Sequence, residues 1–147
     1  MNTVENDLEV GRESVWDYPR PPGLEACPAH LTVVFAGESV ADSRHGFRVL
    51  ETSHPPTYYL PPADVRLDLL RPTAGSSVCE FKGRARYWTI EAHGRQAEAA
   101  AWSYQDPGEE FQAIKGYLAF YPSAMDACFV DGERVRAQAG DFYGGWI

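Results

Sequence analysis

Four charged residues that could take part in binding or catalysis lie within otherwise apolar strand or turn sequences. They are Arg48, Glu51, Lys82 and Lys115. The three cations could hold a polar or anionic ligand, and the carboxylate of Glu51 could accept a hydrogen bond or act as a general base. Taken singly, each fits an ion pair at the rim of the fold, which contributes little energy. Together with the aromatic residues nearby, they favour a binding role for at least one.

Aromatic residues are more numerous than a small core needs, and some form neighbouring pairs. In Tyr87-Trp88 and Phe120-Tyr121, adjacent strand residues point to opposite faces. One ring of each pair could fill the core while the other lines a second surface, as in small-molecule pockets. The alternative, in which both faces are simply packed, is equally open. The pocket hypothesis takes as its wall Tyr58, Trp88, Trp102 and Tyr117.

Histidines and cysteines show no spacing typical of a metal site. The cysteines form no C-x-x-C pair, and the scattered histidines are His30, His45, His54 and His93. We therefore expect no metal and no cofactor. Cys79 near Lys82 could be an activated nucleophile, but the favoured interpretation is a buried thiol close to a hairpin tip. No catalytic residue is assigned, and whether the chain is an enzyme is left open.

Strand propensities and turn signals predict a mainly β fold. A short helix is expected over 62–71, because proline suits its first turn, Asp64 suits its positive end and Pro72 stops it. The prediction is a compact antiparallel sheet, barrel-like or tent-like, in a single domain. Strands are expected at 31–35, 39–41, 47–51, 96–104 and 117–121, with hairpins at 78–90 and 127–135.

Two hairpin sequences resemble each other. Residues 34–40 align without a gap against residues 129–135, and the register places Phe47 opposite Phe142. The turn of the second copy, Asp131-Gly132, is the strongest local hairpin signal in the chain. A real duplication, as opposed to a chance match, implies two related hairpins about a pseudo-twofold axis, with a pocket between them.

Length and proline content suggest the domain organisation. The 147 residues suffice for one core. Residues 1–13 are acidic and are expected to be flexible. Residues 14–30 are proline-rich and predict an extended arm, whose rings Trp16 and Tyr18 would insert into the domain or a partner subunit. Residues 31–147 are expected to form the β-rich domain.

Charge and cysteine content exclude some classes of function. A formal net charge of -8 disfavours general nucleic-acid binding and docking on anionic membranes. The beginning of the chain has no apolar run that would suggest a signal peptide. Three separated cysteines fit reduced thiols, so we expect a cytoplasmic protein.

Motifs spread along the chain resemble those of one known family. They are Ser14 to Pro22, Val34 to Glu38, Arg48 to Glu51, Tyr58 to Pro61, Asp64-Val65, Cys79, Lys82-Gly83, Tyr87-Trp88, Trp102 to Tyr104, Ile114 to Tyr121, Asp131 to Glu133 and Phe142 to Trp146. The family is domain-of-unknown-function family 427, sometimes labelled nucleotidyltransferase-like. The resemblance implies a compact β-rich domain and no particular reaction. Glu80 is a departure, because the family often has proline there. The sequence also lacks a G-x-x-x-x-G-K-[ST] phosphate loop.

Two functional hypotheses follow. The first is a domain that binds or modifies a small polar or anionic molecule in an aromatic-lined pocket, with the four charged residues as anchors. The second is a non-catalytic module for self-association as a homodimer, or for binding a partner protein. It would use the Trp16-Tyr18 arm and the tail from Tyr143 to Trp146.

Overall fold

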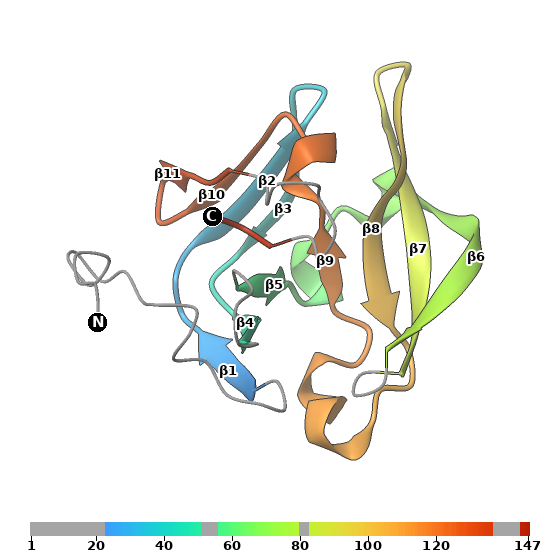
Figure 1. Cartoon of the computed structure of the whole chain (residues 1–147). Helices are drawn as coiled ribbons and strands as arrows, with labels where there is room; N and C mark the ends of the chain where they lie inside the picture. Colours follow the sequence, from blue (N-terminus) through green and yellow to red (C-terminus); the bar gives the residue numbers. More distant parts are fainter. Residues whose placement is uncertain (1–22, 51–55, 80–82, 137–144) are drawn as a thin grey trace.

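The computed structural model describes residues 23–50, 56–79, 83–136 and 145–147 (Figure 1). These residues form strands of two to ten residues in three antiparallel sheets joined by turns, which confirms the predicted mainly β class. The three sheets remain separate and do not close into a barrel within this part of the chain. The arm residues 14–22, Glu51, Lys82 and tail residues 137–144 lie outside the described residues.

The sheets differ in whether neighbouring strands are also consecutive in the sequence. One has the order β1-β4-β5 and comprises β1 (Gly23–Cys27), β4 (Gly46–Leu50) and β5 (Thr57–Tyr59). A second has the order β11-β10-β2-β3 and comprises β11 (Glu133–Arg134), β10 (Ala127–Val130), β2 (Leu31–Phe35) and β3 (Glu38–Ser43). The third is a meander, β6-β7-β8-β9, of β6 (Leu70–Cys79), β7 (Gly83–Ala92), β8 (Arg95–Tyr104) and β9 (Leu118–Phe120).

The helix expected over 62–71 is instead two short 3-10 turns, η3 (Pro62–Asp64) and η4 (Leu67–Leu69). Between them Val65 is extended and forms a bridge with Ala41, and the Arg66 amide donates to the Val40 carbonyl at 2.7 Å. Pairing with β3 therefore outweighs the local helix signals. Two further 3-10 segments are η5 (Glu109–Ile114) and η6 (Pro122–Ala124).

The two hairpins that resemble each other in sequence share one sheet. Their turns match, with φ of 52° and 79° at Ala36-Gly37 and of 52° and 82° at Asp131-Gly132. Two successive positive φ values are typical of the type I′ turn, whose second position favours glycine. The strands that precede these turns, β2 and β10, lie side by side and antiparallel.

The register of β2 and β10 gives this sheet a local pseudo-twofold axis. Val33 on β2 pairs with Cys128 on β10. These two residues are also equivalent to each other when the alignment of the two hairpins is extended by one residue. The flanking pairs are Val34 with Ala127 and Thr32 with Phe129, and a twofold rotation exchanges them. This is the arrangement that the internal repeat predicts, although the expected match of Phe47 with Phe142 involves a residue outside the described part.

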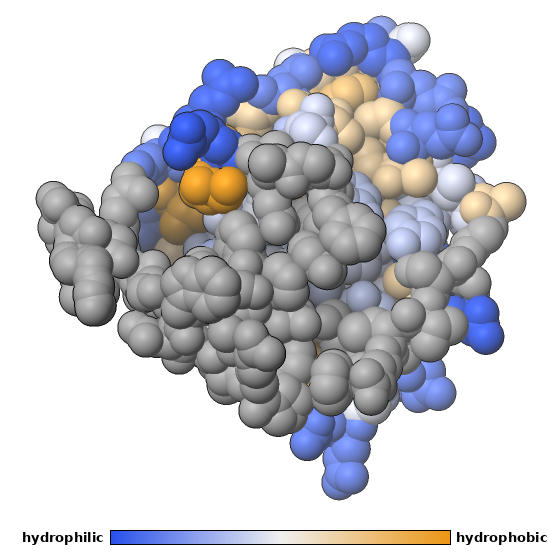
Figure 2. Space-filling view, in the orientation of Figure 1, coloured by the Kyte–Doolittle hydropathy of each residue, from blue (hydrophilic) through white to orange (hydrophobic). Residues whose placement is uncertain are grey.

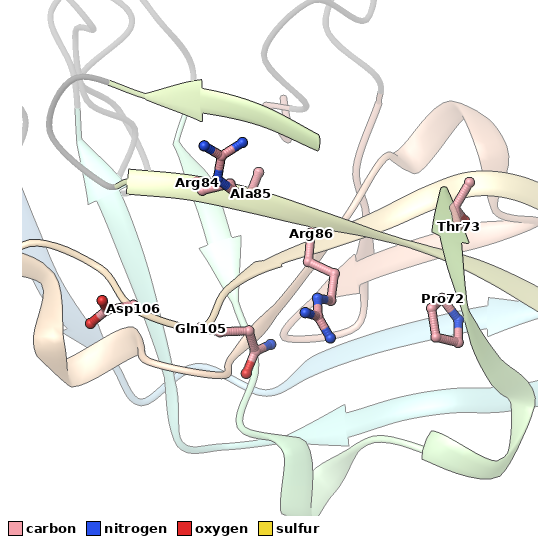
Figure 3. A pocket seen from close by; sticks show the side chains of 7 residues that line it. All are labelled: Pro72, Thr73, Arg84, Ala85, Arg86, Gln105 and Asp106. Atoms are coloured by element: carbon pink, nitrogen blue, oxygen red, sulfur yellow. The ribbon is translucent and has the colours of Figure 1, made fainter. Parts of the chain in front are cut away.

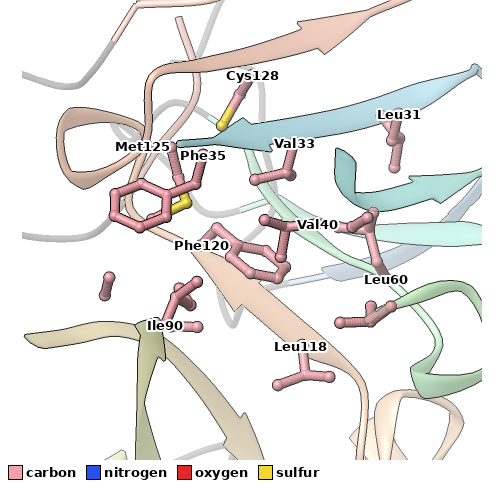
Figure 4. Close-up of a cluster of buried hydrophobic side chains, with 14 of the residues drawn as sticks. Leu31, Val33, Phe35, Val40, Leu60, Ile90, Leu118, Phe120, Met125 and Cys128 are labelled. Carbon is pink, nitrogen blue, oxygen red and sulfur yellow. The ribbon is translucent and has the colours of Figure 1, made fainter. Parts of the chain in front are cut away.

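The third sheet has a hydrophobic core on each face, because neighbouring side chains alternate along its strands. Phe120 contributes to one core, whereas Ala119 and Tyr121 belong to the other. The first core lies between this sheet and the β2-β3 hairpin, and Figure 4 shows Val33, Val40 and Phe120 directed into it. The second core packs the opposite face against β4, β5 and η5.

Polar contacts at the ends of the hairpins tie the second sheet to the third. The guanidinium of Arg95 forms a two-pronged contact with the Asp126 carboxylate, with both distances 3.2 Å, and lies 4.7 Å from the centre of the Phe35 ring. His93 Nε2 lies 2.6 Å from Glu38 Oε2, and this contact lowers the pKa of Glu38. These contacts hold the β7-β8 turn against the β2-β3 turn.

Figure 2 shows one face of the molecule, on which apolar residues are visible between hydrophilic ones. Among the described residues, the large hydrophobic side chains that stay exposed are Leu67 and Ile147. No helix in this part of the chain is long and apolar enough to cross a membrane.

Two cysteines, Cys27 and Cys128, are buried free thiols. Burial raises the pKa of Cys128 to about 12, and it also raises the pKa of Cys27. A protonated, buried thiol is a poor nucleophile. Cys128 therefore acts as a small apolar side chain at the pseudo-twofold axis.

Because the pKa of Cys128 is raised, the stability of the folded state should decrease with pH in the alkaline range. The folded state keeps this proton above the ordinary thiol pKa of 9.0, so its stabilising contribution is complete below pH 9 and is lost as the pH rises toward 12. Urea unfolding between about pH 8 and about pH 11 should show a falling free energy of unfolding. In Cys128→Ala the decline should be shallower, and an equal slope in both proteins would contradict this assignment.

Candidate functional site

The candidate site is a pocket of about 800 Å³ beside strand β7, hereafter the β7 pocket. Strands β6 and β7 and the segment that follows β8 supply its walls (Figure 3). It therefore belongs to the third sheet, not to the space between the two related hairpins. Its lining residues are Pro72, Thr73, Arg84, Ala85, Arg86, Gln105 and Asp106.

Strand alternation explains which side chains reach the pocket. Ala85 is buried in the second core, so its neighbours Arg84 and Arg86 point to the other side of β7. Arg86 pairs across the strands with Ser103, and Gln105 lies two residues beyond Ser103 along the chain. In Figure 3 the side chains of Arg86 and Gln105 extend toward each other, whereas the Asp106 carboxylate points away from Arg86.

The pocket adjoins irregular pairing on both sides of β7. The β6 register shifts between Thr73 and Ser76, and the β8 register shifts opposite Thr89. Within the second shift Ala99 has a φ of +53°, which is unusual for a residue other than glycine. The buried hydroxyl of Thr89 accepts the Ala99 amide at 3.2 Å and lies 2.7 Å from the Thr73 hydroxyl. Such bulges redirect side chains and are frequent beside binding sites.

Beneath the pocket, the fully buried Ser103 holds two side chains in place. Trp88 Nε1 donates to Ser103 Oγ at 2.9 Å. The carboxamide of Gln105 contacts the same oxygen at 2.8 Å, with Nε2 placed as the nearer atom. Trp88 also pairs across the strands with Pro72, a lining residue. The indole and the amide are therefore fixed relative to each other.

Of the residues predicted from sequence, Trp88 is linked to this pocket, and Arg48 and Tyr58 lie elsewhere. Arg48 is on β4, where its Nε donates to Glu25 Oε1 on β1 at 2.8 Å. Tyr58 on β5 is its cross-strand partner and is buried, with its ring centre 5.0 Å from that of Trp146. Glu51 and Lys82 lie outside the described residues.

The other predicted wall residues surround the second core. Trp102 is 6% exposed, its Nε1 lies 3.3 Å from Tyr59 Oη, and its ring centre lies 4.6 Å from that of Tyr121. Tyr117 is half-buried and packs edge-on against Phe47, with ring centres 5.8 Å apart. Lys115 is exposed just after η5. The structure thus distributes the predicted wall over two cores and does not gather it around one cavity.

Sequence reasoning overlooked Arg84, Arg86 and Gln105. A signal was present, because Arg84-Ala85-Arg86 alternates within a predicted strand and so places two arginines on one face. Gln105 gave no comparable signal, since its place depends on a hydrogen bond to the buried Ser103.

A second, smaller pocket of about 310 Å³ lies beside η6 and β10. Its polar groups are largely engaged within the chain. Arg134 donates to the Asp126 carbonyl at 2.8 Å, and the Asp126 carboxylate binds Arg95. The β7 pocket is therefore the better candidate.

Metal-binding side chains do not gather in the described part of the chain. No group of three or more His, Cys, Asp or Glu residues there could hold a metal ion. Two histidines pair instead with single carboxylates, His30 with Asp42 at 2.7 Å and His93 with Glu38 at 2.6 Å.

The architecture defines a small antiparallel β domain with a polar pocket on its meander sheet. The chain belongs to the family described as domain of unknown function (DUF427), whose model matches residues 23–131. This span runs from β1 to the turn after β10 and includes every residue that lines the β7 pocket. The comparison with curated proteins finds no match.

Proposed function

We propose that this domain binds a small polar or anionic molecule in the β7 pocket. The observation that carries the proposal is the guanidinium of Arg86, which lines the pocket and, within the described part of the chain, has no side-chain partner. Acidic residues outnumber basic ones by 21 to 13, yet Arg86 has no carboxylate partner in this part of the chain. The exposed Arg44 has none either, but Arg86 differs from it in lining a pocket. Planar guanidinium groups suit the bidentate recognition of carboxylates and phosphates.

Four other arginines in the described part of the chain differ from Arg86 in having such a partner. Arg48, Arg66, Arg71 and Arg95 each contact a carboxylate. Arg84 adds a second positive charge to the lining of the β7 pocket. With Asp106 as the one carboxylate in the lining, the formal charge of the pocket is positive on an acidic protein, which would draw an anionic ligand to this face.

The test is a thermal-shift screen with two arginine variants. The library would hold phosphate, small carboxylates, sugar phosphates, and nucleotides with and without Mg²⁺. A ligand at about a hundred times its Kd stabilises the folded state by roughly 2.7 kcal/mol, which is readily detected. We expect a stabilising hit that Arg86→Gln loses.

Arg71→Gln is the matched control, because it removes the same charge from an exposed ion pair with Glu91 on the same sheet. It should keep the response. A flat screen at millimolar concentrations, or a hit that survives Arg86→Gln, would refute the proposal.

The alternative of an interaction module draws on the arm and the tail. The arm residues Trp16 and Tyr18 lie outside the described residues. In the tail, Trp146 is 3% exposed, and its Nε1 donates to the Phe120 carbonyl at 3.1 Å. This ring packs within its own chain, so we do not propose self-association as a second function.

A further inference from the structure

The hydroxyl of Ser103 has two donors directed at its oxygen, which leaves its own hydrogen without an acceptor in the described part of the chain. Its Oγ accepts from Trp88 Nε1 and, with the amide in its placed orientation, from Gln105 Nε2. Its own hydrogen then has no acceptor among the described residues, although the side chain is fully buried. A buried hydroxyl without an acceptor is costly, and nearly all buried polar groups in proteins are satisfied.

Rotating the Gln105 carboxamide by half a turn removes this problem. The amide nitrogen and oxygen have almost the same shape, so their positions are assigned from the hydrogen-bond network. With Oε1 toward Ser103, the serine accepts from Trp88 and donates to Gln105 across the same 2.8 Å. Every polar atom of Ser103 then has a partner, and Gln105 Nε2 is turned away from Ser103.

We infer that Gln105 presents its Nε2 donors to the β7 pocket beside Arg86, and that the ligand group bound there is an oxyanion. This inference rests on the proposed function of the pocket. A guanidinium and an amide NH₂ side by side offer donors only, so they suit a phosphate or carboxylate oxygen, which only accepts. A ligand that presents an ammonium group would find no acceptor at this position.

Ser103 is accordingly a positioning residue, because it orients the Gln105 carboxamide. It also pairs across the strands with Arg86. It lies opposite Arg86 on β8 and between Trp88 and Gln105. The indole nitrogen of Trp88 has no lone pair available to accept a hydrogen bond and can only donate. The indole therefore fixes the direction of the serine hydroxyl, and the serine fixes the direction of the amide. The Asp106 carboxylate, which points away from Arg86 in Figure 3, leaves this donor pair unopposed.

The experiment is a titration of ¹⁵N-labelled protein at low ionic strength, followed by NMR. The probes are sodium phosphate, sodium acetate and methylammonium chloride. We expect phosphate or acetate to shift the side-chain NH₂ signals of Gln105, and methylammonium to leave them unchanged. Which of the two anions binds more tightly distinguishes a phosphate site from a carboxylate site.

Variants separate this inference from the proposal on which it rests. Gln105→Met keeps the length of the side chain but removes the amide, and it should weaken anion binding about tenfold, the usual effect of losing a hydrogen bond to a charged group. Gln105 is exposed, so the fold should survive. Arg86→Gln should abolish binding.

Each remaining outcome overturns a defined claim. If anions bind through Arg86 but Gln105→Met binds them equally well, or the Gln105 NH₂ signals stay still, the donor role of Gln105 is wrong and the pocket stands. If methylammonium binds and the anions do not, the oxyanion class is wrong. If no probe binds and the wider thermal-shift screen is also flat, both the inference and the proposed function fail.

Discussion

Trp102→Ala will lower the free energy of unfolding by about 4 kcal/mol, within the usual range for truncating a buried tryptophan. The indole is 6% exposed, donates toward Tyr59 Oη and packs against Tyr121 in the second core. Its removal therefore leaves a cavity and also removes the contact of the indole nitrogen with Tyr59 Oη. Because small domains have only about 5–15 kcal/mol of stability, the loss should be plain in urea unfolding.

Trp102→Phe provides the graded control. It keeps an aromatic ring in the second core and loses the indole N–H, so its cost should be clearly smaller than that of alanine. Below its unfolding temperature, Trp102→Ala should retain the ligand response of the β7 pocket, since Trp102 faces the other side of the sheet. A loss below about 1 kcal/mol would show that Trp102 is not a core residue, and so would favour the pocket wall expected from the sequence.

The order of strands and turns could be predicted because its signals are local. Alternation and β-branched residues mark the strand at 31–35, and the Asp131-Gly132 pair marks the hairpin of β10 and β11. The match between the two hairpins suggests a pseudo-twofold relation if the duplication is real, and in the structure β2 and β10 pair about Val33 and Cys128. For the strand at 31–35 and the Asp131-Gly132 turn, the decisive residues lie within a few positions of one another.

The failed helix prediction has a non-local cause. The segment 62–71 has a good first turn and a clear stop, but Val65 pairs with Ala41, more than twenty residues away. Val65 is buried and Leu69 packs against the same core, as their spacing predicts, but without a helix. Local propensity is weak against such tertiary contacts.

The candidate site was harder to predict than the fold, for a similar reason. Aromatic pairs such as Tyr87-Trp88 were expected to divide between two faces, and they do so. The sequence could not show that a second core covers the other face. The pocket depends on register shifts beside β7 and on the buried Ser103, and neither has a signature within a short window.

Gly46→Ala will destabilise the protein by about 3 kcal/mol, at the upper end of what overpacking commonly costs. Gly46 begins β4, and a Cβ added there would lie 2.6 Å from Leu31 Cδ1 and 2.9 Å from the Tyr59 carbonyl oxygen. The leucine side chain is fully buried, and the carbonyl belongs to the backbone of β5, so neither can move freely. Here the absence of a side chain lets the β1-β4-β5 sheet approach β2 closely.

Gly37→Ala separates this steric effect from the conformational freedom of glycine. Gly37 has a φ of +79° with nothing within 4 Å of an added Cβ, so alanine there should cost only about 1 kcal/mol. Urea unfolding of both variants should therefore show a loss at position 46 that clearly exceeds the loss at position 37. Equal losses would mean that β4 can shift away from Leu31 and Tyr59, and that the contact between these two sheets is looser than the packing of Gly46 indicates.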